Sequence, residues 1–220
     1  MIVVHHLENS RSLRILWLLE ELEVDYEIVR YQRDARSMLA PAALQQVHPL
    51  GKSPVVVDGE QVIAESGAII EYLVATHGGE WLVPSAGTAS RVRYLEWLHY
   101  AEGSLMPLLV MRLVISRLSK SPVPAPLRPV GKLLAGGMRR QFLDPQLQRH
   151  LAYCEQCAGA HTWLTGEHFS AADIQMGFPL LALDLRGGLE GYPALKRLLQ
   201  AMRERPAYRR AVEKGGELNL

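Results

Sequence analysis

The chain has 220 residues, of which 48% are hydrophobic and 21% are charged, and its formal net charge is +1. This composition is typical of a soluble globular protein, and the length is enough for one large domain or two small ones. The balanced charge argues against nucleic acid as the main partner. We expect no membrane partner, because no apolar stretch looks long enough to cross a bilayer. Two cysteines and a start unlike a signal peptide predict a cytoplasmic protein.

The first third of the chain alternates between strand-like and helix-like patterns. Residues 2–7 form a β-rich run, and residues 12–22 repeat apolar side chains at helical spacing. Residues 26–31 alternate as a strand does, and residues 35–47 predict a short helix or loop.

A hairpin and a helix follow. Residues 55–57 and 61–64 flank Asp58-Gly59, which is a strong signal for a tight turn. Ser66 is expected to be the N-cap of a helix that runs to about residue 77. The order strand, helix, strand, hairpin, helix predicts a mixed sheet.

The remainder of the chain is expected to be helical. Residues 78–88 are rich in glycine and proline and predict a linker, and the segment 89–220 contains no convincing strand. Helical patterns cover residues 90–118 with a bend near Pro107, then 138–162, 171–186 and 193–204, and a proline-rich loop is expected over 119–129. The predicted fold class is therefore α/β followed by all-α.

The sequence Gly-Lys-Ser-Pro at residues 51–54 places a proline at the mouth of a strand, where it cannot donate to the sheet. A cis bond before Pro54 would turn the Ser53 backbone outward, where it can pair with a short peptide. Lys52 supplies a cation for a carboxylate. The helix that starts at Ser66 offers its N-terminus, and Glu65 can accept from an ammonium group.

Three segments together resemble a cytosolic glutathione transferase of the serine, theta-like type, and the resemblance covers nearly the whole chain. They are NSRSLRILWLLEEL (9–22), HPLGKSPVVVDGEQVIAESGAIIEYL (48–73) and FSAADI (169–174). The resemblance implies a thioredoxin-like glutathione-binding domain at 1–77, a linker at 78–88 and an all-helical domain at 89–220 that contributes the acceptor pocket. It also implies a homodimer.

The resemblance assigns glutathione as co-substrate and gives it a set of contacts. Ser53 and Pro54 are expected to hold its cysteinyl backbone, Glu65 and Ser66 its γ-glutamyl end, and Lys52 to lie near its glycyl end. In FSAADI, Ser170 and Asp173 form a capping box, which we interpret as a folding device without a catalytic role.

Glutathione attacks as a thiolate, so a donor near a helix N-terminus is expected to stabilise its sulfur. Ser10, in the loop after the first strand, is the first candidate and matches the serine of theta-like members. Ser12, Arg11 and Asn9 are the alternatives. No cysteine occupies this loop, which disfavours dithiol chemistry, and no tyrosine precedes Tyr26.

Tyr100, Ser104 and Leu108 share a helical face and are predicted to line the acceptor pocket, although the same face can instead pack on other helices or a partner. By analogy, Glu102 is expected to reach the partner subunit's glutathione. His150, Cys154, Cys157 and His161 lie on one helix that is too long for all four to bind one zinc ion, so no metal is expected.

These features predict a cytoplasmic, homodimeric detoxification enzyme that joins the glutathione thiolate to electrophilic small molecules. A glutathione-dependent peroxidase, dehalogenase or isomerase has the same thiolate, and a non-catalytic ligand-binding or interaction protein has the same fold.

Overall fold

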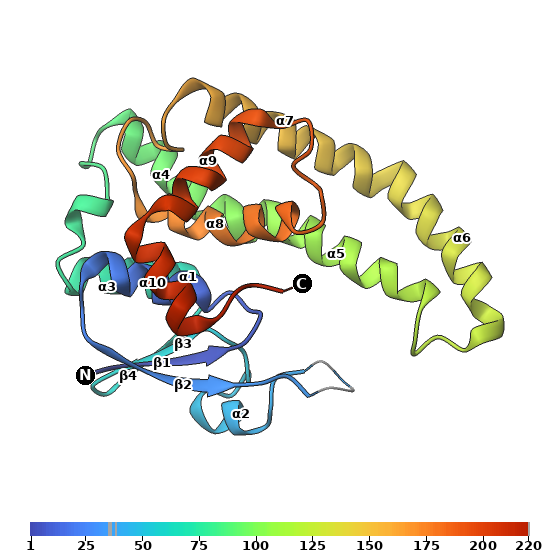
Figure 1. Ribbon diagram of the computed structural model, residues 1–220, viewed down its shortest axis with the longest axis horizontal. Coiled ribbons are helices and arrows are strands. Elements are labelled where there is room, and N and C mark those ends of the chain that lie inside the picture. Colours follow the sequence, from blue (N-terminus) through green and yellow to red (C-terminus); the bar gives the residue numbers. More distant parts are fainter. Residues whose placement is uncertain (35–36, 38, 220) are drawn as a thin grey trace.

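The computed structural model describes residues 1–34, 37 and 39–219 (Figure 1). Its first part contains β1 (Ile2–Leu7), α1 (Leu13–Leu22), β2 (Tyr26–Tyr31), α2 (Ala43–Val47), β3 (Val55–Asp58), β4 (Gln61–Ala64) and α3 (Ser66–Thr76). Of the predicted segment 35–47, Ala35, Arg36 and Met38 lie outside the described residues.

The four strands form one sheet in the order β2-β1-β3-β4. β1 pairs in parallel with β2 and antiparallel with β3, which in turn pairs antiparallel with β4. The predicted mixed sheet is confirmed. Helix α1 connects the two parallel strands, as a strand–helix–strand unit requires.

The second part is helical. It contains α4 (Ala89–Tyr100), α5 (Met106–Ser116), α6 (Arg128–Met138), α7 (Asp144–Ala160), α8 (Ala171–Asp184), α9 (Pro193–Glu204) and α10 (Pro206–Gly215). Two of these differ from expectation. α6 starts inside the predicted proline-rich loop, since a proline in the first turn of a helix loses no hydrogen bond. α10 was not predicted, and it packs on α1.

Helices α4 and α5 join into one continuous run, Ala89–Ser119, through a π-helical turn at Ala101–Leu105. The turn ends just before Pro107, whose missing N–H and bulky ring disturb regular α-helical bonding. The run has 31 residues, and an 18-residue window has mean hydropathy 1.2. By length and composition it can cross a membrane, so the expectation that no stretch is long enough was wrong.

Helix α8 is the central element of the core. All but one of its residues are buried, and it contacts α1, α3, α4, α5 and α9. Ser170 caps it, with Asp173 accepting from the Ser170 backbone N–H at 2.9 Å, which confirms the capping box. The Trp17 ring of α1 packs against Phe169 and Tyr208. These contacts fix the position of α8 against α1, which begins directly after residues 8–12, called here the serine loop.

Candidate functional site

Strand register brings the predicted glutathione contacts to one edge of the sheet. His5 of β1 lies opposite Val55, and Val55 lies opposite Ala64. The residues just beyond these pairs are therefore neighbours: Ser53-Pro54 on one segment and Glu65-Ser66 on the next. The loop to α1 leaves β1 at the same edge.

Ser53 is fastened to β1 by its own side chain. Its hydroxyl donates to the His5 carbonyl oxygen at 2.9 Å and accepts from the Leu7 N–H at 3.2 Å. The Ser53-Pro54 peptide bond is cis, as the sequence predicted. Lys52, beside it, has an exposed side chain.

Ser66 does not cap α3. Glu65 occupies the N-cap position with φ 69°, and Ser66 is the first residue of the helix. The buried Ser66 hydroxyl oxygen instead accepts from Arg14 Nη1 and from Gln175 Nε2, both at 3.3 Å. Because its oxygen already accepts twice, the hydroxyl proton is left to donate. The free N–H groups of the first helical turn lie beside it and favour an anion.

Arg14 is a fully buried cation. Its side chain is 1% exposed, donates to Gln175 Oε1 at 2.7 Å and lies over the Phe178 ring at 5.1 Å. Burial lowers the Arg14 pKa to about 10, while the Glu102 charge opposes this shift. Its Nε and Nη2 have no partner among the described residues. An arginine this deeply buried requires an anion nearby.

Glu102, in the π-helical turn, supplies that anion. Its Oε1 lies 2.9 Å from Arg14 Nη1, and Arg11 Nε donates to both carboxylate oxygens at 3.0 and 2.9 Å. Both carboxylate oxygens of Glu102 thus bind cations of the same chain, and its expected contact with the partner subunit's glutathione stays a prediction. The Arg11–Glu102–Arg14 triad joins the serine loop to the helical part.

Ser10 belongs to a hydrogen-bonded chain that runs inward from the loop. Its Oγ accepts from the Ser12 N–H at 3.2 Å and lies 2.8 Å from Ser12 Oγ, which lies 2.9 Å from His6 Nδ1. His6 Nε2 faces the Gly215 carbonyl oxygen at 2.9 Å. A carbonyl only accepts, so we assign the His6 proton to Nε2. Burial lowers the His6 pKa, which favours the neutral ring.

In that arrangement Ser12 donates to His6, and Ser10 donates to Ser12. Ser12 is fully buried, whereas Ser10 lines an adjoining cavity. Of these three hydrogen-bonded side chains, Ser10 is the one that lines the cavity, and Ser12 and His6 lie behind it. An anion arriving in the cavity competes with Ser12 for the Ser10 proton.

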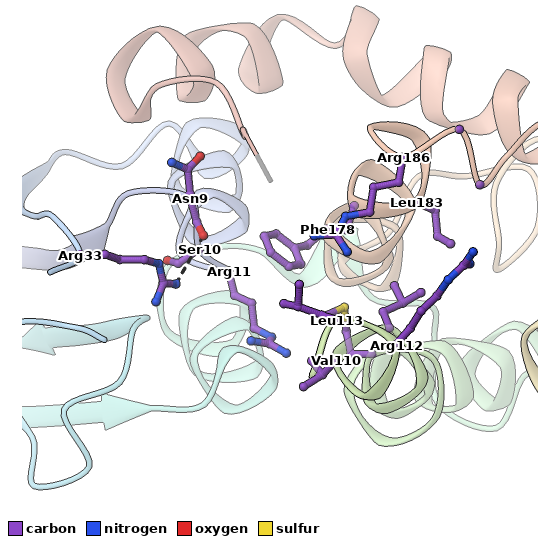
Figure 2. A pocket seen from close by; sticks show the side chains of 15 residues that line it. Asn9, Ser10, Arg11, Arg33, Val110, Arg112, Leu113, Phe178, Leu183 and Arg186 are labelled. Carbon is purple, nitrogen blue, oxygen red and sulfur yellow. Dashed lines mark hydrogen bonds between the residues drawn. The ribbon is translucent and has the colours of Figure 1, made fainter. Parts of the chain in front are cut away.

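This cavity, of about 330 Å³, lies between the serine loop, α5 and the end of α8. Figure 2 shows Asn9, Ser10 and Arg33 on one side, Arg112, Leu183 and Arg186 on the other, and the Phe178 ring between them. Its wall is otherwise largely apolar and includes Met106, Leu109, Val110, Leu113 and Ala182.

The cavity is cationic. Arg11, Arg33, Arg112 and Arg186 line it, and no aspartate or glutamate of the described residues does. Arg11 is paired with Glu102. Within the described part of the chain, the Arg112 and Arg186 side chains have no hydrogen-bond or ion-pair partner.

Tyr100, Ser104 and Leu108 are not among the residues lining this cavity. The Tyr100 hydroxyl faces His150 Nδ1, and its ring packs against Trp97. Leu108 packs on a small separate cluster around Ile115. The intervening π-helical turn adds one residue, which rotates the downstream part of the helix by about 100°. Other residues of the same helical run line this cavity, and the expected role of Tyr100, Ser104 and Leu108 in an acceptor pocket stays a prediction.

The structure adds site residues that sequence reasoning did not single out. They are Arg33, Arg112, Phe178 and Arg186 in the cavity, Gln175 behind Ser66, and His6 behind Ser12. His6 was interpreted as structural. Its only sequence signal was alternation along β1, which places His5 and His6 on opposite faces. Among residues 1–34, 37 and 39–219, no group of three or more metal-ligating side chains is found.

Comparison with known proteins identifies the family. Residues 1–75 match the model of the glutathione S-transferase N-terminal domain, and residues 135–210 match that of the C-terminal domain. Glutathione S-transferase 3 of Schizosaccharomyces pombe is 40% identical over 217 residues, covering 97% of this chain and 88% of that protein.

Solved structures agree. A glutathione S-transferase from Actinobacillus pleuropneumoniae superposes with TM-score 0.82 at 32% identity, covering 100% of this chain and 95% of the other. A sphingomonad glutathione S-transferase complexed with glutathione has TM-score 0.73 at 22% identity, covering 97% and 98%, and supports the fold. The chain belongs to the glutathione S-transferase family. It is an enzyme of this class, with a thioredoxin-like first domain and a helical second one.

Glu102→Gln is expected to lower the free energy of unfolding by about 2 kcal/mol, because it leaves the buried Arg14 without an anion. The loss is smaller than for a fully buried pair, since the Glu102 side chain is partly exposed. Urea denaturation measures this loss. The matched control is Asp184→Asn, which breaks the more exposed pair with Arg203 and should cost under about 1 kcal/mol. Adding Arg14→Met to Glu102→Gln should recover part of the loss. Equal losses in the two single variants would contradict the role of Glu102.

Proposed function

We propose that this enzyme binds glutathione along the sheet edge and joins its thiolate to apolar acceptors that carry an anionic group. The observation that carries the proposal is the position of Ser10. Its hydroxyl lines the cavity on one side, and its loop leaves β1 directly after Leu7, whose N–H donates to the Ser53 hydroxyl at the sheet edge. A thiol held at that edge therefore has both a donor and an adjoining acceptor space.

Glutathione is assigned the contacts that the family resemblance implies. The outward backbone of Ser53 pairs with its cysteinyl residue, and Lys52 lies near its glycyl carboxylate. Ser66, with the α3 N-terminus, holds the γ-glutamyl carboxylate, and exposed Glu65 accepts from the ammonium group. Support comes from the Ser66 hydroxyl, whose oxygen accepts from Arg14 and Gln175 and whose proton faces no acceptor among the described residues.

Ser10 is proposed as the donor that stabilises the thiolate. A hydrogen bond to an ionised group contributes about 1.5–3 kcal/mol, which is enough to lower a thiol pKa by one to two units. Arg11, at the same end of the cavity, adds positive potential, although Glu102 offsets it. We further propose that the enzyme acts in the cytoplasm as a homodimer in detoxification.

The acceptor class follows from the cavity lining. Apolar side chains from α5 and α8 accommodate a hydrophobic body, and the unpaired guanidinium groups of Arg112 and Arg186 lie across the cavity from Ser10 (Figure 2). Arginine binds carboxylate and phosphate oxygens through paired donors. The preferred acceptor is thus an electrophile with its anionic group at the end away from the reacting carbon.

Ser66→Ala should raise the glutathione dissociation constant about tenfold or more, because a charge-assisted hydrogen bond is lost. Isothermal titration calorimetry measures this without requiring turnover. Ser85→Ala, an exposed serine outside the site, serves as the matched control and should leave the affinity unchanged. An unchanged affinity in Ser66→Ala would remove Ser66 from the binding set.

Ser10→Ala should lower kcat for 1-chloro-2,4-dinitrobenzene by about 10- to 100-fold while glutathione affinity persists. The rise of kcat/KM with pH should move to higher pH, because the thiol pKa is no longer depressed. Ser12→Ala, which changes a hydroxyl that does not reach the cavity, should have a smaller effect. If Ser10→Ala keeps its full rate, another group activates the thiol. If the wild-type enzyme binds glutathione but turns over neither electrophile nor peroxide, a carrier role is supported instead.

The Arg112→Gln/Arg186→Gln double variant should lose a preference for anionic acceptors. The probes are 4-chloro-3,5-dinitrobenzoate and the neutral 4-chloro-3,5-dinitrobenzamide, with each rate divided by its uncatalysed rate. The wild type should favour the carboxylate by about tenfold in kcat/KM. Arg117→Gln, an exposed arginine on the same helical run outside the cavity, should keep this preference. A preference that survives in the double variant contradicts the proposed acceptor class.

A further inference from the structure

Residues 107–143, called here the arm, project away from the rest of the molecule as a helical hairpin of α5 and α6 (Figure 1). The arm has a core of its own that consists of Ile115, Ala135 and Leu143, with Leu108 packed against it. This small cluster buries few of the arm's apolar side chains.

Most of the other large apolar side chains of the arm face outward. The arm holds ten of the twenty large apolar side chains that are exposed in the described part of the chain. Leu127, Val130, Leu134 and Met138 on α6 are 56%, 56%, 58% and 49% exposed. They recur every three or four residues, so they form one continuous stripe along the helix. An apolar stripe on the outside of a projecting helix indicates an interaction surface.

The charges of the arm have a single sign. Seven of the chain's 24 lysines and arginines lie in it, and none of its 23 aspartates and glutamates does. The seven are Arg112, Arg117, Lys120, Arg128, Lys132, Arg139 and Arg140. Arg128 and Lys132 on α6, with Arg139 directly after it, lie on a second face, which flanks the apolar stripe. The rest of the chain keeps 17 basic and 23 acidic side chains and is therefore net acidic.

We infer that the arm docks on an anionic lipid surface. The α6 stripe enters the boundary between headgroups and acyl chains, and the flanking cations face the lipid phosphates and carboxylates. The net acidic body is repelled by the same surface, so the charge distribution orients the molecule with the arm toward the lipid. This surface is separate from the proposed conjugation site, apart from Arg112 at the base of the arm.

Two alternatives fit the arm less well. The helical run Ala89–Ser119 does not cross the bilayer in this fold, because its first half places Trp97 and Leu98 in the protein core. Pairing of two arms between copies of the chain brings seven cations toward seven others, which opposes association. Among the described residues only Arg139 of the seven has an acidic partner, Asp144 at 3.8 Å. A lipid surface supplies many anions and an apolar layer together.

Vesicle flotation with the full-length enzyme tests the inference. Vesicles of phosphatidylcholine alone are compared with vesicles that also contain about 30% phosphatidylserine. Binding to the anionic vesicles should be at least about tenfold stronger and should weaken greatly in about 0.5 M salt, which screens charge. Equal binding to the two kinds of vesicle, or binding to neither, overturns the proposal without any variant being needed.

Two arm variants test the two parts of the surface. Arg128→Glu/Lys132→Glu reverses charge, and Leu134→Ser/Met138→Ser removes part of the stripe. Each should lower vesicle binding about tenfold or more. The control Arg149→Glu/Lys196→Glu reverses two exposed charges on α7 and α9 and should bind as the wild type does. A control that loses binding equally shows that net charge alone is responsible, which contradicts a role for the arm.

Two further measurements separate the outcomes. Conjugation of 1-chloro-2,4-dinitrobenzene should be unchanged in both arm variants, because none of the four residues lines the acceptor cavity. If the wild type has no such activity, the proposed function fails while the vesicle result still stands. Sedimentation velocity that shows concentration-dependent assembly, abolished by Leu134→Ser/Met138→Ser, together with no vesicle binding, assigns the stripe to a second copy of the chain and rejects the lipid surface.

Discussion

The buried guanidinium of Arg14 is the constraint on which the arrangement of the site depends. It lies one helical turn beyond Ser10, and it is out of reach of water. A cation in that position must be neutralised and hydrogen-bonded, and its partners come from three separate elements: Glu102 after α4, Gln175 on α8 and Ser66 on α3. Satisfying one side chain therefore fixes the sheet edge against the helical part, and the acceptor cavity opens between them.

The parts of this site that sequence could predict are those defined by neighbouring residues. The conformation at Ser53-Pro54 involves one peptide bond, and the capping box of Ser170 and Asp173 involves one helical turn. A short sequence motif is therefore enough to predict each of them. The order of strands and helices was predictable for a similar reason, since each segment carries its own apolar period. The mixed sheet follows from that order of segments, because the connections between them are short and allow few topologies.

The parts that sequence could not predict depend on rotation and long-range contact. The side of the α4–α5 run that faces the cavity is set by the π-helical turn, which no spacing rule anticipates, so Leu109 and Leu113 line the wall while Tyr100 points to α7. The net charge likewise does not predict how charge is distributed over the molecule. A total of +1 conceals a basic arm and an acidic body, and their separation matters only because the hairpin projects.

The contact between His6 and the Gly215 carbonyl spans 209 positions of sequence, and it bears on how such enzymes diversify. A recombinant that takes its sheet from one relative and its helices from another inherits the serine loop without the backbone that supports it. Exchange of acceptor preference between relatives is therefore simplest by point changes along the cavity wall. The two halves of the chain therefore depend on each other at the serine loop, although one is built around a sheet and the other is helical.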